Sequence, residues 1–162
     1  MSVNERLLEK EGAMRILIAH DGSPLADAAV KETLKTTWPA GTEVHLVTVV
    51  EWPVAFEPPY PDYPGPAIDK IHEILVDKAK RTLASAAESI AARRDLKVTT
   101  ALREGSPKHA LLDAIEAWKP DLVVAGSTGK TGLKRLFLGS VCHALVTYAP
   151  CNVLVVKPPL QH

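Results

Sequence analysis

Three glycines at fixed spacing, followed by a serine, are the residues of this chain best suited to bind a phosphate group. They follow the pattern G-x2-G-x9-G-[ST], carried by Gly126, Gly129, Gly139 and Ser140. Glycine lets a backbone approach an anion closely, and the amides of such a loop and of the next helix point toward that anion. A plain turn is the alternative, which Gly132 disfavours by adding to the glycines of the segment. The pattern therefore predicts a phosphate site with a nucleotide as its ligand.

Two other phosphate-binding motifs are excluded by position. A P-loop, G-x-x-x-x-G-K-[ST], would share Gly129 and the following lysine, but it needs a glycine where the chain has Val124. The dinucleotide fingerprint, G-x-G-x-x-G, should follow the first strand, where residues 20–23 read His-Asp-Gly-Ser instead. The glycine pattern is therefore the motif that remains to be explained.

The elements that position these residues alternate between strand and helix. Continuous apolar runs predict buried strands at 14–19, 44–50, 96–102, 121–125 and 153–156. Helices are predicted at 25–37, at 68–93 and at 140–147, and a further helix after Pro107 has an apolar stripe from Ala110 to Trp118. Ser23-Pro24 and Ser106-Pro107 each predict an N-cap serine followed by a proline in the first helical turn. This alternation predicts an α/β domain with a parallel, doubly wound sheet.

Each predicted helix has an apolar face that should contact the sheet. The expected faces are Leu25, Ala28, Ala29 and Leu34 in the first helix, Ile71, Leu75, Ala79, Ala86 and Ile90 in the second, and Ala110, Leu111, Ala114, Ile115 and Trp118 in the third. Residues 51–66 are proline-dense, which excludes helix and central strand there. Their aromatic residues predict either a surface loop with some side chains tucked down, or a lid or contact surface.

Composition narrows the class of protein. The 162 residues suit one domain, and 19 basic residues balance 19 acidic ones, so no charge excess indicates a nucleic-acid partner. No apolar run reaches the roughly 18 residues of a membrane span, and the charged N-terminus lacks a signal-peptide pattern, so a cytoplasmic location is expected. Cys142 and Cys151 form no metal motif and are expected to pack as small apolar residues.

Four segments in order carry a family resemblance: residues 16–23, 44–50, the glycine loop, and 149–156. Over residues 14–157 the chain resembles the ATP-binding branch of the universal stress protein family. The resemblance implies a five-stranded Rossmann-like sheet of order 3-2-1-4-5 with helices on both faces, as in adenine nucleotide alpha hydrolases. Residues 1–13 are then a short N-terminal extension, 51–66 a loop insertion and 158–162 a C-terminal tail. That order puts the topological switch between strands one and four, where Asp21 and Gly126 lie.

The resemblance implies ATP as ligand, with Mg²⁺ or Mn²⁺. The implied ATP-binding residues are Ala19, Asp21, Val49, Gly126, Ser127, Gly129, Gly139, Ser140 and Val141. Asp21 would contact the adenosine or help order the metal, unless it caps the first helix, for which Ser23 is better suited. Ser140 would bond a phosphate, cap its helix, or do both. Ser127 is preferred over Thr128 as a hydroxyl donor to phosphate.

Several neighbours of these residues keep two interpretations. Lys130, Lys134 and Arg135 are either charge partners of the phosphates or part of a solvated loop face. His20, where relatives often carry an apolar residue, either faces the nucleotide or is a half-buried structural histidine.

No catalytic set is apparent, so at most slow ATP hydrolysis is expected. The function expected from the resemblance is a nucleotide-dependent stress regulator with an unknown protein partner. The alternatives are a slow ATPase or self-phosphorylating enzyme, and a chaperone-like protein that binds no nucleotide. The resemblance also implies a homodimer through the last strand, which reads Val153, Leu154, Val155 and Val156.

Overall fold

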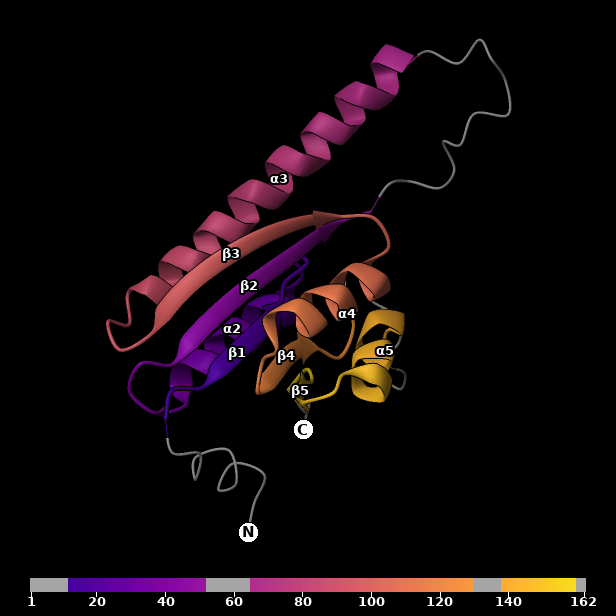
Figure 1. Ribbon diagram of the computed structural model, residues 1–162. Coiled ribbons are helices and arrows are strands. Elements are labelled where there is room, and N and C mark those ends of the chain that lie inside the picture. The colour runs from indigo at the N-terminus through magenta and orange to yellow at the C-terminus, as the bar shows by residue number, and fades with distance from the viewer. Residues whose placement is uncertain (1–11, 52–64, 130–137, 160–162) are drawn as a thin grey trace.

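The computed structural model describes residues 12–51, 65–129 and 138–159, and side chains from residue 69 onward in the second of these ranges. Figure 1 shows strands and helices in alternation along the chain. The strands are β1 (Arg15–Ala19), β2 (Glu43–Val50), β3 (Lys97–Glu104), β4 (Leu122–Gly126) and β5 (Asn152–Val156). The helices are α2 (Pro24–Lys35), α3 (Gly65–Ala91), α4 (Pro107–Trp118) and α5 (Ser140–Tyr148). None of the described helices is both long and apolar enough to cross a bilayer.

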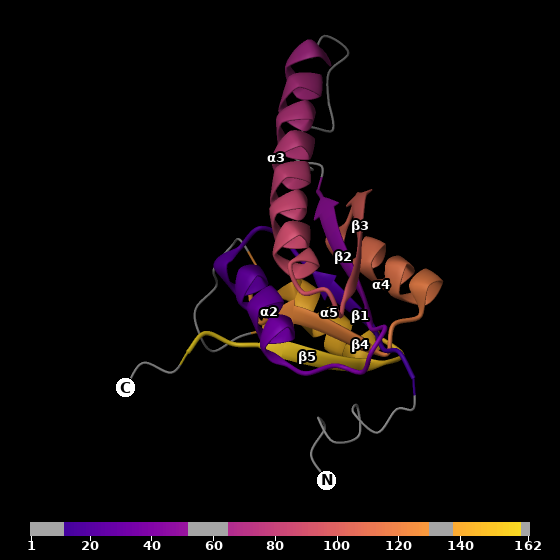
Figure 2. The ribbon, with the colours of Figure 1, turned by 90° about the vertical axis from the view of Figure 1, so that its left-hand side faces the viewer.

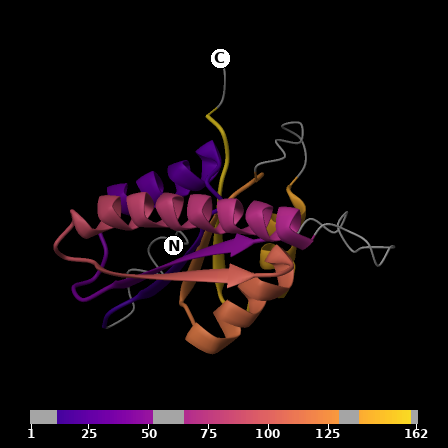
Figure 3. The same ribbon diagram turned by 90° about the horizontal axis from the view of Figure 1, so that it is seen from above.

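The five strands form one parallel sheet of order β3-β2-β1-β4-β5, which confirms the expected fold. β1 is central, and its last residue, Ala19, pairs with Val47 of β2 and with Ala125 of β4. Figure 3 shows α2 and α3 on one side of the sheet and α4 on the other. The chain leaves β1 toward one side of the sheet and leaves β4 toward the other side. A crevice therefore stays open at the carboxyl ends of these two neighbouring strands.

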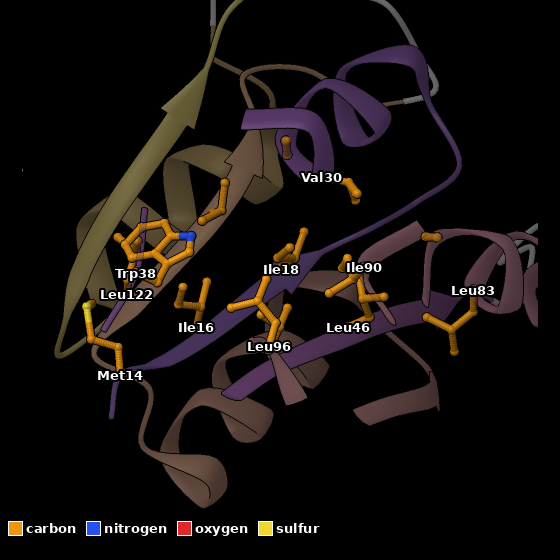
Figure 4. Close-up of a cluster of buried hydrophobic side chains, with 14 residues drawn as sticks. Met14, Ile16, Ile18, Val30, Trp38, Leu46, Leu83, Ile90, Leu96 and Leu122 are labelled. Carbon is orange, nitrogen blue, oxygen red and sulfur yellow. The ribbon is translucent and has the colours of Figure 1, made fainter. Parts of the chain in front are cut away.

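Two apolar cores, one on each side of the sheet, pack the helices against the strands. On the α2–α3 side, Ile16 and Ile18 of β1 pack with residues of β2, α2 and α3, as Figure 4 shows. On the α4–α5 side, Leu17 of β1 packs with Leu111, Ile115 and other residues of α4, α5 and β4. Alternation along each strand therefore assigns every strand residue to one of the two sides.

The helix termini differ in detail from the predictions. α3 begins at Gly65, inside the segment expected to lack helix, because proline in a first turn removes no intrahelical hydrogen bond. Ser23 caps α2 as expected, since its side chain accepts a hydrogen bond of 3.2 Å from the amide of Ala26. Ser106 stands at the N-cap of α4 but makes no side-chain cap bond.

The expected helix faces were partly wrong. In α2, Ala29 is buried as predicted, but Ala26, Val30 and Thr33 are the other buried residues, and Leu25, Ala28 and Leu34 are only partly covered. In α4 the prediction holds for Leu111, Ala114 and Ile115.

In α3, Ala79, Ala86 and Ile90 are buried as predicted, but Ile71 is 39% exposed and Leu83 joins the core instead. Figures 1 and 2 show the reason: the N-terminal half of α3 extends past the ends of β2 and β3. Helical periodicity identifies the apolar side of a helix, but the sheet it packs against here covers only part of its length.

Candidate functional site

A cavity of about 710 Å³ opens across the carboxyl ends of β1, β2 and β4. The N-terminal turns of α2, α4 and α5 and one face of α3 complete its walls. Eight of the nine predicted ATP-binding residues line it: Ala19, Asp21, Val49, Gly126, Gly129, Gly139, Ser140 and Val141. The fold therefore brings together residues from four strands or helices and two loops at the switch point of the sheet.

The turn between β1 and α2 holds Asp21 at the cavity. One carboxylate oxygen, Oδ1, accepts a hydrogen bond of 2.9 Å from the amide of Ser23, and Gly22 supports the turn with a φ of +80°. The other oxygen, Oδ2, lies against the glycine loop, only 2.6 Å from where a side chain on Gly129 would begin. Asp21 therefore stabilises its own turn and also faces the loop, whereas the helix cap itself is Ser23.

The three glycines of the motif meet different neighbours. A Cβ on Gly126 would lie 2.8 Å from the Cβ of Leu25, so this glycine lets the start of α2 pack against β4. A Cβ on Gly129 would instead press on the Asp21 carboxylate, and one on Gly139 would lie 3.4 Å from the backbone of residues 127 and 128. None of these three glycines has a φ in the left-handed region. Glycine is therefore selected at each position by the close approach of neighbouring atoms and not by the backbone conformation.

Backbone hydrogen bonds close the loop between β4 and α5. The amide of Ser127 donates to the carbonyl of Val156 at 2.8 Å, and the amide of Gly139 donates to the carbonyl of Ser127 at 2.7 Å. Ser127 is 6% exposed and is absent from the cavity wall, whereas Thr128 contributes to it. The backbone of Ser127 thus ties the loop, and which hydroxyl meets a phosphate stays a prediction.

The N-terminus of α5 supplies amide donors to the cavity. Gly139 is the N-cap, so Ser140 is the first helical residue and does not cap the helix as one interpretation expected. The first bond of the helix runs from the amide of His143 to the carbonyl of Gly139 at 2.9 Å. The helix therefore offers no acceptor to the amides of Ser140, Val141 and Cys142, all of which line the cavity. Such amides favour an anion.

Apolar side chains line the cavity on the α4–α5 side of the sheet. Val47 and Val49 of β2, Leu111 of α4 and Val141 of α5 are among them. Sequence reasoning did not assign Val47, Pro107 and Leu111 to the site, because the patterns of their segments predict strand and helix and not a phosphate contact. The signal available was the Ser106-Pro107 turn, which marks a second helix that starts at the same edge of the sheet as α2.

The titratable groups at the cavity are few and mixed in sign. Asp21, Glu51 and Lys78 line it, and Lys130, Lys134 and Arg135 lie outside the described residues. Burial raises the pKa of the Cys142 thiol, so this residue stays a neutral packing group, as expected for both cysteines. His20 is fully buried rather than half-buried, with Nε2 3.0 Å from Asp27 Oδ1.

The described residues contain no group of three or more His, Cys, Asp or Glu side chains that could hold a metal ion. A Mg²⁺ or Mn²⁺ ion at this cavity would therefore need ligands from bound phosphates, with Asp21 as the carboxylate on the loop side. That donor set suits Mg²⁺, which proteins commonly bind through one carboxylate and the phosphates of a substrate.

A doubly wound parallel sheet with a cavity at its switch point defines an α/β protein of the class that binds ligands at the carboxyl edge of the sheet. The chain belongs to the universal stress protein family, whose model matches residues 12–157.

Individual members of the family are similar along most of their length. A universal stress protein of Methanocaldococcus jannaschii is 33% identical over 146 residues, which cover 90% of this chain and 82% of that one. A relative from Thermus aquaticus is 32% identical, with 88% and 97% covered. The solved structure of universal stress protein UspA from Lactobacillus plantarum superposes with a TM-score of 0.76 at 25% identity, covering 91% of this chain and all of that one.

Proposed function

We propose that this protein binds ATP together with Mg²⁺ or Mn²⁺ and acts as a nucleotide-dependent stress regulator in the cytoplasm. The observation that carries the proposal is the convergence of a glycine loop, a helix N-terminus, an aspartate and an apolar wall on one cavity. These are the groups that a nucleotide needs: donors for its phosphates and an apolar surface for its base.

Structural neighbours support an adenine nucleotide as the first ligand to test. One is a universal stress protein in complex with cAMP, and another is a family member from Arabidopsis thaliana with AMP bound. They are 19% and 18% identical to this chain with TM-scores of 0.54 and 0.52, so the likeness to them is one of fold. The preference for ATP rests instead on the glycine motif and on the length of loop available to a triphosphate.

In the proposed complex the phosphates lie along residues 126–129 and the N-terminus of α5. Gly129 and Ser140 would offer backbone amides, Gly139 would allow close approach because it has no side chain, and Lys130 and Arg135 would add positive charge. The base would lie against Val49 and the neighbouring apolar wall on the α4–α5 side. ATP with its metal would supply a compact, negatively charged ligand whose presence depends on the energy state of the cell.

A regulator also needs a way to present its bound state to a partner. We infer a homodimer through β5, which is the edge strand next to β4 and carries the 37% exposed Leu154. The regulatory protein partner would then read the nucleotide state of this dimer. Slow hydrolysis or self-phosphorylation is the alternative outcome, because Asp21 and a metal-bound triphosphate would meet at the same cavity.

Calorimetry with ATP tests the proposal, on the wild-type protein and on Asp21→Ala. We expect binding in the presence of Mg²⁺, weaker binding with a chelator, and a clear loss of affinity in the variant, because Asp21 Oδ2 faces the loop. Release of ADP over hours, absent in the variant, would favour the enzymatic alternative. Absence of binding at millimolar ATP would contradict the nucleotide function altogether.

A further inference from the structure

The outer edge of β3 is the longer of the two edges of the sheet. β3 and β5 stand at opposite ends of the strand order, so each pairs with only one described strand. β3 has eight residues, whereas β5 has five. It pairs with β2 in unbroken register over its whole length, and Figure 1 shows it on the far side of β2 from β1. A long and regular edge strand is a template on which a further strand can be added.

Alternate residues of β3 direct their backbone groups away from β2. The amide of Lys97 donates to the carbonyl of Thr42 at 3.0 Å, and the amide of Gly105 donates to the carbonyl of Val50 at 3.0 Å. The amide and carbonyl of one residue point to the same edge of a strand, and successive residues alternate, so the odd-numbered residues of β3 face β2. The residues whose backbone groups point to the outer edge are therefore Val98, Thr100, Leu102 and Glu104.

The middle of β3 lacks the features by which proteins commonly block an edge strand. Residues 98–102 read Val-Thr-Thr-Ala-Leu, without a charged residue, a proline or a bulge. Valine and threonine also favour the extended conformation. The charged side chains of β3 stand at its ends, on Lys97, Arg103 and Glu104. Five consecutive residues are therefore suited to pair with an added strand.

The side of the sheet that α4 covers is positively charged near this edge. Alternation places Arg15, Lys97 and Arg103 on that side of β1–β3, with Glu43 as the acid among these strand residues. Glu43 lies 3.8 Å from Arg15 and offsets part of this charge. After the larger effect of burial, the charges of Arg103 and Arg15 both lower the pKa of His45, which lies between them on β2. An acidic partner therefore complements this surface.

The spacing of the two basic residues of β3 sets the spacing of the acids. Lys97 and Arg103 are six residues apart and share one side of the strand. In an antiparallel pair, side chains on opposite residues lie on the same face, so the partner needs acids six residues apart. Glu104 lies on the other side of the sheet, where its Oε2 is 3.1 Å from Nε2 of His72.

A second copy of the chain fits this edge less well. An antiparallel pairing centred on Thr100 would set Lys97 of each copy opposite Arg103 of the other. Like charges directly opposite one another destabilise a strand pair. The charges of β3 thus favour a different, acidic strand over its own.

We propose that the outer edge of β3 binds an extended, acidic segment of another protein, which adds to the sheet as an antiparallel strand. Backbone hydrogen bonds to Val98, Thr100 and Leu102 hold the segment, and Lys97 and Arg103 select its acidic ends. This edge lies at the opposite end of the strand order from β5. The interaction therefore does not depend on the proposed dimer, and it uses none of the proposed nucleotide contacts.

Calorimetry with a designed peptide tests the proposal on the whole protein without nucleotide. The probe is Glu-Val-Thr-Val-Thr-Val-Glu with blocked ends, and the matched control has lysine in place of both glutamates. We expect saturable binding of the probe and roughly tenfold weaker binding of the control, because two attractions become repulsions. No binding of the probe at millimolar concentration, or equal binding of both peptides, would overturn the proposal.

Two N-methylated forms of the probe test whether it binds as a strand. In the antiparallel pairing the amide of its fourth residue faces β3 and that of its third residue faces away. Methylation of the fourth amide should abolish binding, whereas methylation of the third should preserve it. Equal effects of the two methyl groups would contradict strand addition.

Amide hydrogen exchange locates the bound peptide. The outward amides of Val98, Thr100 and Leu102 should exchange quickly in the free protein and slow down when the probe binds, whereas those of Thr99 and Ala101, which face β2, should be slow throughout. Outward amides that are already slow in a monomeric protein would show that this chain covers its own edge. Protection that rises with protein concentration, together with a doubled mass in light scattering, would show that a second copy does so. Either result would overturn the proposal.

A charge reversal at Arg103 tests the selection of acidic ends. Arg103→Glu should weaken binding of the acidic probe and strengthen binding of the lysine control. Arg81→Glu makes the same change at an exposed position of α3 and should alter neither affinity. Circular dichroism verifies that both variants are folded. Unchanged affinities in folded Arg103→Glu would contradict the role of this residue.

Discussion

Single glycines at this cavity have separate roles, although one motif contains them all. Gly126 meets the Cβ and backbone of Leu25, and therefore sets how closely α2 approaches β4. Gly129 meets the end of the Asp21 side chain, and therefore sets the shape of the site. A change at the first position should appear mainly in stability, and a change at the second mainly in ligand binding.

The first prediction concerns stability at Gly126. Gly126→Ala should lower the free energy of unfolding by about 1–3 kcal/mol, because the new methyl group overlaps Leu25 and α2 must move. Urea unfolding measures the change. Gly139→Ala is the matched control, since its methyl group would meet neighbours no closer than 3.4 Å and should cost less. Equal stability of Gly126→Ala and wild type would contradict this packing argument.

His45 of β2 is not among the residues that line the cavity, and its surroundings shift its pKa. Its ring stacks on Trp118 with centroids 5.0 Å apart, and Nδ1 lies 2.7 Å from the Thr99 hydroxyl. Burial, followed by the positive charges of Arg103 and Arg15, lowers the pKa of His45 below its ordinary value of 6.5.

This lowered pKa predicts a pH dependence of stability. The unfolded chain takes up the proton more readily than the folded one, so the contribution of neutral His45 is present above about pH 6.5 and is lost as pH falls through the lower folded pKa. His45→Phe keeps a ring against Trp118 but cannot titrate, so its stability should fall less steeply on acidification. Urea unfolding from about pH 5 to pH 8 compares the slopes. Identical slopes would show that His45 does not contribute.

Among the elements, β5 pairs with β4 along one edge, and no described strand pairs with its other edge. The carbonyl of Val156 accepts from the amide of Ser127, so Val156 and, two residues earlier, Leu154 direct their backbone groups toward β4. Val153 and Val155 consequently direct theirs outward, at the edge of the sheet. The proposed dimer would use these outward groups.

Val155→Pro should dissociate that dimer and leave the monomer folded, because proline removes an outward amide and no amide of the ladder with β4. Light scattering measures the mass, and circular dichroism verifies the fold. Val155→Ala retains the amide and serves as control, which should remain dimeric. A dimeric Val155→Pro protein would exclude this interface.

The order and type of the elements could be predicted from the sequence, because buried parallel strands appear as runs such as Ile16–Ile18 and most boundaries fall within two residues of the prediction. Strand order came from the family resemblance. The start of α3 and the exposure of Ile71 could not be predicted, since they depend on where the neighbouring sheet ends. The missing cap bond at Ser106 is likewise a matter of local geometry that residue type does not determine.

At the scale of the whole molecule, the switch point of the sheet explains why distant motifs form one cavity. Asp21 follows the end of β1 and Gly126 ends β4, and the chain leaves these two neighbouring strands toward opposite sides of the sheet. Their placement at one edge of the sheet follows from the strand order. Leu75 of α3 and Leu111 of α4 were missed as cavity residues, because helices contribute them only after tertiary packing. The sequence thus predicts the motif residues of the site, and the fold supplies its walls.

The most direct test of the account is ATP affinity by calorimetry with Mg²⁺, on wild type and on Gly129→Val. The variant places a branched side chain where the first atom alone would lie 2.6 Å from Asp21 Oδ2. We expect binding by wild type and at least a tenfold loss, about 1.4 kcal/mol, in a variant that still unfolds cooperatively. Unchanged affinity in the folded variant, or no binding by wild type at millimolar ATP, would contradict the central claim that this glycine loop binds a nucleotide.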